Sequence, residues 1–140
     1  MTTDAPVRHH ALPSTSSLKA SARSAARLGE PLVVMTTLDG CPYCDLVRQY
    51  LVPMQKQGQV HAVQLDIRDR QSRLEDFQGR NSTPADQATL FKARFAPTVL
   101  FLGPQGEELA ERLVGMAVPD LYGGYLEVRL DESRARLKKG

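Results

Sequence analysis

Two cysteines separated by two residues, in the segment Cys41-Pro42-Tyr43-Cys44, are the residues of this chain best suited to chemistry. They are the only cysteines among its 140 residues, so any thiol chemistry must use them. The apolar run Leu32–Met35 precedes them and a stretch of helical periodicity follows, which places the first sulfur at a helix N-terminus. Free backbone N–H groups and the positive end of the helix dipole favour an anion there. Because the thiolate anion is the reactive form of cysteine, this pattern predicts a redox-active pair.

The two residues between the cysteines suit the same position. Pro42 fits the first turn of a helix, where the N–H that proline lacks is not needed. Tyr43 is expected to shield the sulfurs without adding charge.

Two other uses of the cysteine pair remain open at this point. A structural zinc site needs four ligands, and the only histidines are His9, His10 and His61, of which the first two lie in a polar stretch. A structural disulfide across so short a loop would restrain little chain entropy. Both alternatives are therefore disfavoured against redox activity, and we expect no metal and no cofactor.

The cysteine pair must be positioned by elements that the apolar periodicity predicts on either side of it. These are a helix after a cap at Ser16 or Ser17, a strand from Leu32 to Thr37, a helix from Pro42 to about Gln57, a strand from Val60 to Ile67, a short helix anchored by Leu74 and Phe77, a helix from Pro84 to Arg94, strands at Thr98–Leu102 and Leu109–Val114, and a last helix from Pro119. A helical crossover joins the first two strands, so they should pair in parallel. Leu90, Phe91 and Phe95 are expected to pack inward.

Length and composition limit the class of protein. The chain has the length of a single domain, which we place at residues 17–140 after a flexible tail of residues 1–16. Its 41% hydrophobic and 24% charged residues are typical of a soluble globular protein. The net charge of +2, with dispersed basic residues and few aromatics, argues against nucleic acid as a partner. No apolar run approaches the roughly 20 residues that span a bilayer.

A second candidate site element is Ala96-Pro97-Thr98. Proline at the entrance of a central strand is unusual, because it cannot donate a hydrogen bond to the neighbouring strand. A cis bond before Pro97 would form a turn and leave the strand edge open near the cysteines. From spacing alone cis is the minority outcome, since roughly one X-Pro bond in twenty is cis.

Between residues 31 and 126 the chain resembles the thioredoxin superfamily. The resemblance rests on Cys41–Cys44, Phe95–Phe101, Gly106–Leu109 and Val114-Gly115, which follow one another in the order of that family. It implies an α/β thioredoxin fold, with a central mixed sheet of about four strands flanked by helices. An N-terminal extension helix and a helical insertion before the proline strand would be additions to it. The resemblance also implies that Pro97 is cis and packs beside the cysteines, and that Ala96 presents its backbone to an extended substrate.

Several positions depart from the family pattern. Gly40 stands where thioredoxins have a tryptophan, and Met35 stands where they have a buried aspartate that helps to move a proton of the second cysteine. Cys-Pro-Tyr-Cys is the glutaredoxin spelling, yet the glutathione clamp of that family has no match, since Gly123-Gly124 lies too deep in the last helix. The pattern is most similar to bacterial periplasmic thioredoxin-like proteins of the SoxW and SoxS types, which are linked to sulfur oxidation.

The predicted function is that of a thiol-disulfide oxidoreductase of either direction. Cys41 would attack a substrate disulfide and Cys44 would resolve the mixed disulfide, while Ala96, Pro97, Pro42 and Tyr43 would bind the substrate. We expect the pKa of Cys41 to lie below that of a free thiol, although the charge of Asp39 opposes this effect.

The alternative is a redox-sensing or partner-binding module without turnover, whose polar segment 68–83 would contact a dedicated partner. The expected partners are protein disulfides or dithiols and an upstream electron-transfer partner, with no membrane span and a monomeric state. The expected location is the periplasm, after removal of a signal peptide that this chain does not show, and the alternative is the cytoplasm.

Overall fold

A mixed sheet of four strands forms the centre of the molecule. The structure is a computed structural model that describes residues 12–116 and 118–139. Strand β1 (Leu32–Thr37) runs parallel to β2 (His61–Asp66) and antiparallel to β5 (Thr98–Leu102), which pairs antiparallel with β6 (Glu108–Val114). The sheet order is therefore β2-β1-β5-β6. The predicted mixed sheet of about four strands is confirmed, as is the parallel pairing of the first two strands.

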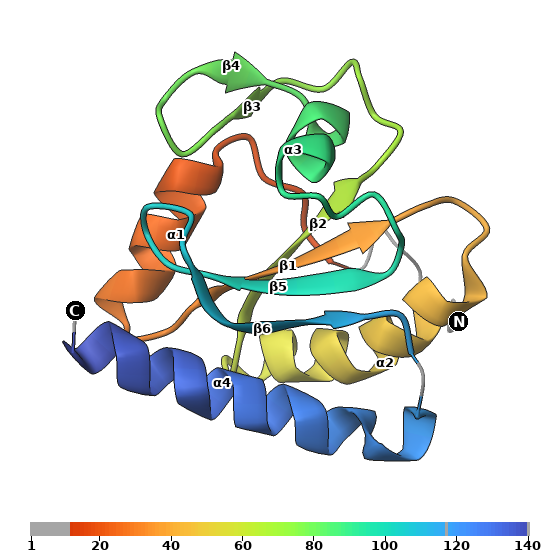
Figure 1. The fold of residues 1–140 in the computed structure, drawn as a ribbon, viewed down its shortest axis with the longest axis vertical. Coiled ribbons are helices and arrows are strands. Elements are labelled where there is room, and N and C mark those ends of the chain that lie inside the picture. Colours follow the sequence, from red (N-terminus) through yellow and green to blue (C-terminus); the bar gives the residue numbers. More distant parts are fainter. Residues whose placement is uncertain (1–11, 117, 140) are drawn as a thin grey trace, which may run out of the picture.

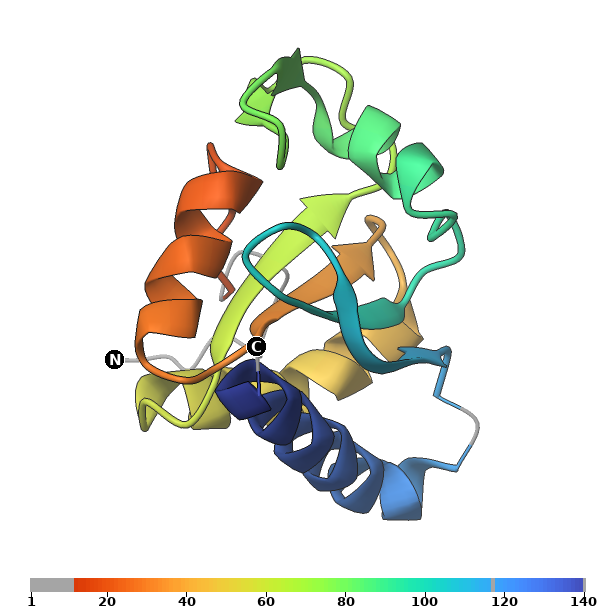
Figure 2. The ribbon, with the colours of Figure 1, turned by 60° about the vertical axis from the view of Figure 1, so that its left-hand side comes forward.

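Helices cover both faces of this sheet (Figures 1 and 2). Helices α2 (Pro42–Lys56) and α4 (Tyr122–Lys139) lie on one face, and the short 3₁₀ turn η2 (Pro119–Leu121) leads into α4. Helix α1 (Leu18–Arg27) lies on the other face, beside a small two-stranded sheet and helix α3 (Pro84–Leu90). Three layers result, as expected for a sheet that is apolar on both sides.

The continuous apolar run of β1 follows from this double coverage. Val33 and Met35 belong to the core cluster that contains Cys44 and the buried residues of α2 and α4. Leu32 and Val34 belong to the opposite cluster with α1. Successive side chains of a strand point to opposite faces, so a strand between two layers must be apolar at every position.

The ordered structure begins before α1. Ser17 is the N-cap of α1, and its hydroxyl accepts a hydrogen bond from the N–H of Ala20 at 2.9 Å. Upstream of this cap, Leu12 is buried in the core and the carbonyl of Pro13 accepts a hydrogen bond from the N–H of Gln64. The tail predicted for residues 1–16 thus overlaps a segment, residues 12–16, that packs on the domain. Residues 1–11 lie outside the described part of the chain.

The insertion before β5 differs from the prediction. In place of a short helix at Leu74 and Phe77, the chain forms a hairpin of β3 (Leu74–Glu75) and β4 (Asn81–Ser82). Asp76 closes this hairpin, because its carboxylate accepts the N–H groups of Gln78 and Arg80 at 2.9 and 2.8 Å. The hydrogen bond from the Arg80 backbone is the main cause that holds the pKa of Asp76 below its usual value of 3.8. Side-chain turns of this kind compete with helix formation. The predicted helical insertion is therefore a hairpin followed by the short α3.

Helix α3 is shorter than predicted. It ends at Leu90, and Lys92 then adopts the left-handed conformation with φ of 55°, which a continuing helix does not allow. Leu90 is 65% exposed, so its expected inward orientation is wrong. Phe91 is half-buried and packs edge-on against Phe77 of the insertion, with ring centroids 6.0 Å apart.

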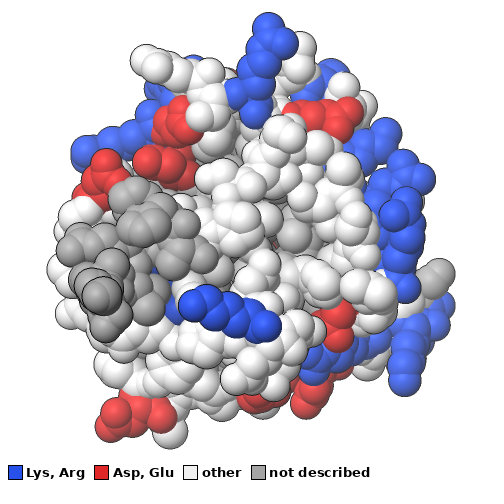
Figure 3. Space-filling model, turned by 180° about the vertical axis from the view of Figure 1, so that it is seen from behind, with Lys and Arg blue, Asp and Glu red and all other residues white. Residues whose placement is uncertain are grey.

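Charges of both signs occur on the face that Figure 3 shows. They lie mostly around its margin, and a wide area toward the centre carries few charged side chains. None of the helices in the described residues is long and apolar enough to cross a membrane.

Candidate functional site

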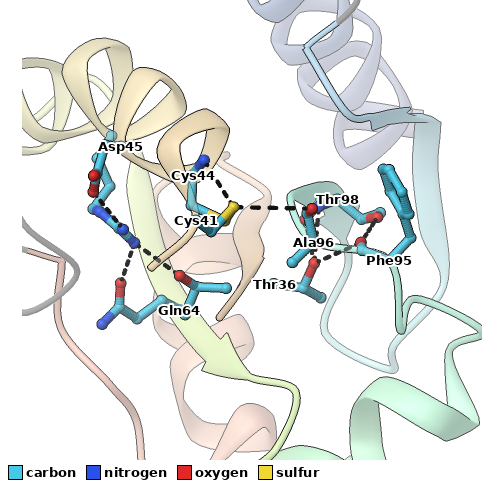
Figure 4. Close-up of a disulfide and its surroundings, with 10 residues drawn as sticks. Thr36, Cys41, Cys44, Asp45, Gln64, Phe95, Ala96 and Thr98 are labelled. Atoms are coloured by element: carbon cyan, nitrogen blue, oxygen red, sulfur yellow. Dashed lines mark hydrogen bonds and ion pairs between the residues drawn. A yellow bond between two sulfur atoms is a disulfide. The ribbon is translucent and has the colours of Figure 1, made fainter. Parts of the chain in front are cut away.

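The two cysteines form a disulfide at the N-terminus of α2 (Figure 4). Cys41 is the N-cap residue, and its sulfur accepts a hydrogen bond from the N–H of Cys44 at 3.1 Å. The Cα atoms of the pair are 5.3 Å apart, within the usual range for a disulfide. Pro42 occupies the first helical position and Tyr43 is exposed. A backbone N–H aimed at a sulfur is the arrangement that stabilises a thiolate at a helix start.

The two sulfurs differ in their access to solvent. Cys44 is fully buried in the core cluster, beside Met35 and Val47 among others. Cys41 is partly exposed and packs at the margin of that cluster. An external thiol or disulfide can therefore reach Cys41 and not Cys44. This asymmetry assigns the two cysteines different chemical tasks.

The loop before β5 forms the opposite wall of the site. The bond between Ala96 and Pro97 is cis, and Pro97 is buried. The carbonyl oxygen of Ala96 lies 4.0 Å from the sulfur of Cys41. The carbonyl of Pro97 accepts a hydrogen bond from the N–H of Gly115, just after β6, at 2.7 Å. Two segments that are 55 residues apart in the sequence therefore meet at one sulfur atom.

Thr36, a buried residue near the end of β1, holds the cis-proline loop against the strand that leads into Cys41. Its hydroxyl accepts a hydrogen bond from the N–H of Thr98 at 2.8 Å and donates one to the carbonyl of Phe95 at 3.2 Å. The loop that carries Ala96 is thereby attached to the strand that leads into Cys41 (Figure 4). Sequence reasoning assigned Thr36 only to a strand, although a buried polar residue just before the motif was a usable signal, because such groups are nearly always hydrogen-bonded.

An apolar groove of about 330 Å³ lies next to the cysteine pair, with Tyr43 and Ala96 in its lining. Its walls come from α2, the cis-proline loop and the end of β6, and the lining residues are Tyr43, Phe95, Ala96, Pro97, Val114, Gly115 and Met116. None of these side chains is charged. Phe95 is 62% exposed and Val114 57% exposed, so the prediction that Phe95 packs inward is wrong. Large apolar side chains exposed together commonly mark a protein-binding surface.

The six residues predicted for the site are thus brought together. Cys41, Pro42, Tyr43 and Cys44 occupy the first turn of α2, and Ala96 and Pro97 face them across the Cys41 sulfur. Tyr43, Ala96 and Pro97 line the groove, whereas Pro42 is exposed and lies outside its lining.

A buried arginine near the site was missed by the sequence analysis. Arg48 of α2 is only 2% exposed, and its guanidinium donates hydrogen bonds to three side chains. The acceptors are the hydroxyl of Thr37 at 3.0 Å, the side-chain oxygen of Gln64 at 3.2 Å and the carboxylate of Asp45 at 2.9 Å. The signal was its spacing, because Arg48 follows Cys44 by four residues and so falls on the buried face of the helix.

Within residues 12–116 and 118–139, no group of three or more His, Cys, Asp or Glu side chains is placed to hold a metal ion. Gly123 and Gly124, the residues compared above with the glutathione clamp of glutaredoxins, both lie inside α4.

Comparison with solved structures shows the same fold. Mitochondrial thioredoxin 3 of Saccharomyces cerevisiae, in its oxidised form, matches with a TM-score of 0.56 and 16% identity, over 86% of this chain and 97% of its own. Thioredoxin NaTrxh of Nicotiana alata matches with a TM-score of 0.56 and 21% identity, over 93% and 99%. Trxlp of Edwardsiella tarda matches with a TM-score of 0.53 and 20% identity, over 81% and 95%. At these identities the likeness concerns the fold alone.

Comparison with sequences is consistent with this result. The search among curated proteins found no significant match. The family model described as a thioredoxin-like domain matches residues 18–128, which include α1, the cysteine pair, the cis-proline loop and the start of α4. With this match over most of its length, the chain belongs to the thioredoxin-like domain family.

Proposed function

We propose that this protein is a thiol-disulfide oxidoreductase that acts on protein substrates through the Cys41–Cys44 couple. The single observation that carries the proposal is the position of the Cys41 sulfur. It is partly exposed, it accepts a backbone N–H at a helix start, and it lies 4.0 Å from the carbonyl oxygen of Ala96, a residue that lines the apolar groove.

The reaction in the reductive direction has two exchange steps. The thiolate of Cys41 attacks one sulfur of a substrate disulfide, which forms a mixed disulfide and releases the other substrate sulfur as a thiolate. Cys44 then loses its proton and attacks the Cys41 sulfur, which releases the second substrate thiolate and closes the Cys41–Cys44 disulfide. Two electrons pass to the substrate, and a dithiol of an upstream partner must supply them again. In the oxidative direction the same steps run in reverse.

The groove supports a protein substrate over glutathione. Glutathione carries two carboxylates and an amino group, which charged or polar side chains would recognise. The groove lining offers none, while its exposed aromatic and aliphatic side chains suit an apolar segment of a polypeptide. As the family resemblance implies, the backbone of Ala96 would pair with such a segment in the extended conformation.

Reduction of insulin by dithiothreitol, followed as turbidity, tests this function. The native protein should accelerate the reaction catalytically, and Cys41→Ser should abolish the acceleration. Leu90→Ala, which keeps both sulfurs and changes an exposed side chain outside the groove lining, is the control. A native protein without turnover that forms a stable complex with one partner would refute the proposal and support the redox-sensing or partner-binding module. The periplasmic location stays a prediction that rests on the family resemblance.

A further inference from the structure

Arg48 is the most buried charged residue in the described part of the chain. Its side chain is 2% exposed, and one guanidinium nitrogen, Nε, is buried without a hydrogen-bond partner in the part of the chain that the structure describes. Taking a cation out of water costs several kcal/mol unless partners compensate. Only one of its three acceptors is an anion, and that anion, Asp45, has a side chain 52% exposed. A methionine would fill the same space in the core without burying a charge. Packing therefore does not explain why an arginine occupies this position.

Arg48 lies one helical turn after Cys44 on the same buried face of α2. Cys44 and Arg48 are four residues apart on α2, and the Cβ atoms of such pairs are roughly 5–6 Å apart. Side chains of a helix lean toward its N-terminus, which here is the end that holds the sulfurs. The contacts agree with this direction, because Arg48 reaches back to Asp45 and to Thr37 at the end of β1, the strand that leads into Cys41.

The remaining charges around the sulfurs are better exposed to water than Arg48. The turn before the motif carries Asp39, which is exposed, and α2 itself carries Asp45. Strand β1 has no charged residue, β2 ends at the half-exposed Asp66, and the loop before β5 carries the exposed Arg94. Water and salt screen exposed charges strongly and buried charges weakly. The field of Arg48 is therefore expected to dominate at the sulfurs.

We propose that Arg48 is a positioning residue that sets the redox equilibrium of the dithiol by stabilising its thiolate. The inference rests on the proposed function, since it concerns the same cysteine couple. Reduction of the Cys41–Cys44 disulfide takes up two electrons from a reference dithiol, which is oxidised to its own disulfide. One of the two protein thiols formed then gives its proton to solvent. A buried cation stabilises that thiolate and so the reduced protein, which makes the Cys41–Cys44 disulfide a stronger oxidant.

Three variants separate the charge of Arg48 from its packing. Arg48→Met keeps the bulk and removes the charge, Arg48→Lys keeps the charge and changes the hydrogen bonds, and Asp45→Asn leaves Arg48 without its anion. Two readouts apply to each variant: the pH dependence of Cys41 alkylation by iodoacetamide, and the equilibrium of the dithiol with a glutathione redox buffer. Neither readout requires a protein substrate.

For Arg48→Met we expect proton binding by the Cys41 thiolate to strengthen about tenfold, which is about one pKa unit. The equilibrium with glutathione should move about tenfold toward the disulfide, or about 30 mV for a two-electron couple. Arg48→Lys should stay close to the native protein. Asp45→Asn should shift both readouts severalfold in the opposite direction, toward the thiolate and the reduced form.

The proposal is overturned if Arg48→Met leaves both readouts unchanged, or if Arg48→Lys shifts them as far as Arg48→Met does. If Arg48→Met does not fold, Asp45→Asn decides, because no shift or a shift toward the disulfide would contradict the proposal. A protein inactive on insulin that still shows these shifts would refute the proposed function and leave the role of Arg48 standing.

Discussion

Phe95 offers the most direct test of how the groove recognises its substrate. We expect Phe95→Ala to weaken activity on a protein disulfide and to leave the fold intact. The backbone of Phe95 is held independently of its ring, because its carbonyl accepts the hydroxyls of Thr36 and Thr98. The ring itself is 62% exposed, so its removal opens little of the core.

The size of the effect follows from the area that a substrate can cover. A phenylalanine side chain buries about 150–250 Å² when fully covered, so the exposed share leaves roughly 100–150 Å² for a partner. At about 25 cal/mol per Å², this area is worth at most about 4 kcal/mol. Part of that energy is lost in ordering the substrate, so we expect kcat/KM for insulin to fall about tenfold, or about 1.4 kcal/mol.

Two controls make this prediction specific. Leu90→Ala removes another large apolar side chain, 65% exposed, that lies on α3 outside the groove lining, and it should leave insulin reduction unchanged. A small aromatic disulfide such as dithiobis-nitrobenzoate, which cannot span the groove, should be reduced by Phe95→Ala at nearly the native rate. Equal losses on both substrates, or a loss in Leu90→Ala as large as that in Phe95→Ala, would refute this account of the groove.

Three further predictions concern the resolving step and stability. Cys44→Ser should accumulate a mixed disulfide between Cys41 and insulin, because the only resolving sulfur is gone. The adduct should be visible on a non-reducing gel and disappear with dithiothreitol, and a gel without it would contradict the assignment of Cys44. Phe101→Ala, at a fully buried position, should lower the free energy of unfolding in urea by about 3–5 kcal/mol, and a loss below 1 kcal/mol would show a core that collapses around the gap. The lowered pKa of Asp76 means that its stabilisation is complete above the unfolded value of 3.8 and is lost as the pH falls through the lower folded value. Asp76→Asn should therefore unfold at a lower temperature than the native protein near neutral pH, with a gap that closes in acid; a gap that is independent of pH would rule this out.

The linear pattern of residues was sufficient for the elements whose signals are local. The first sulfur falls at a helix start because an apolar strand, a turn and Pro42 follow one another within a dozen residues, and each favours that geometry by itself. Strand Thr98–Leu102 was predicted with its observed bounds, because its apolar run is flanked by Pro97 on one side and Gly103-Pro104 on the other.

The insertion shows where local signals fail. Leu74 and Phe77 have the spacing of a helical face, yet the carboxylate of Asp76 captures backbone N–H groups and closes a hairpin. Ser17 at the start of α1 then bonds to Glu75 of that hairpin, 58 residues along the chain. A pairing of this kind depends on which segments the folded chain brings side by side, and periodicity within one segment does not contain it.

The sequence by itself determined the reactive pair, the helix that carries it and the strands beneath it, since these follow from short-range periodicity and backbone restrictions. Only the tertiary structure decided which polar and aromatic groups surround the sulfurs. Arg48 is buried because β1 and β2 supply acceptors for it, and Phe95 is exposed because its loop is fastened to Thr36 with the ring outward. Burial is a property of neighbours distant in the chain, so residue type alone predicts it least well where a charge or a large ring serves the site.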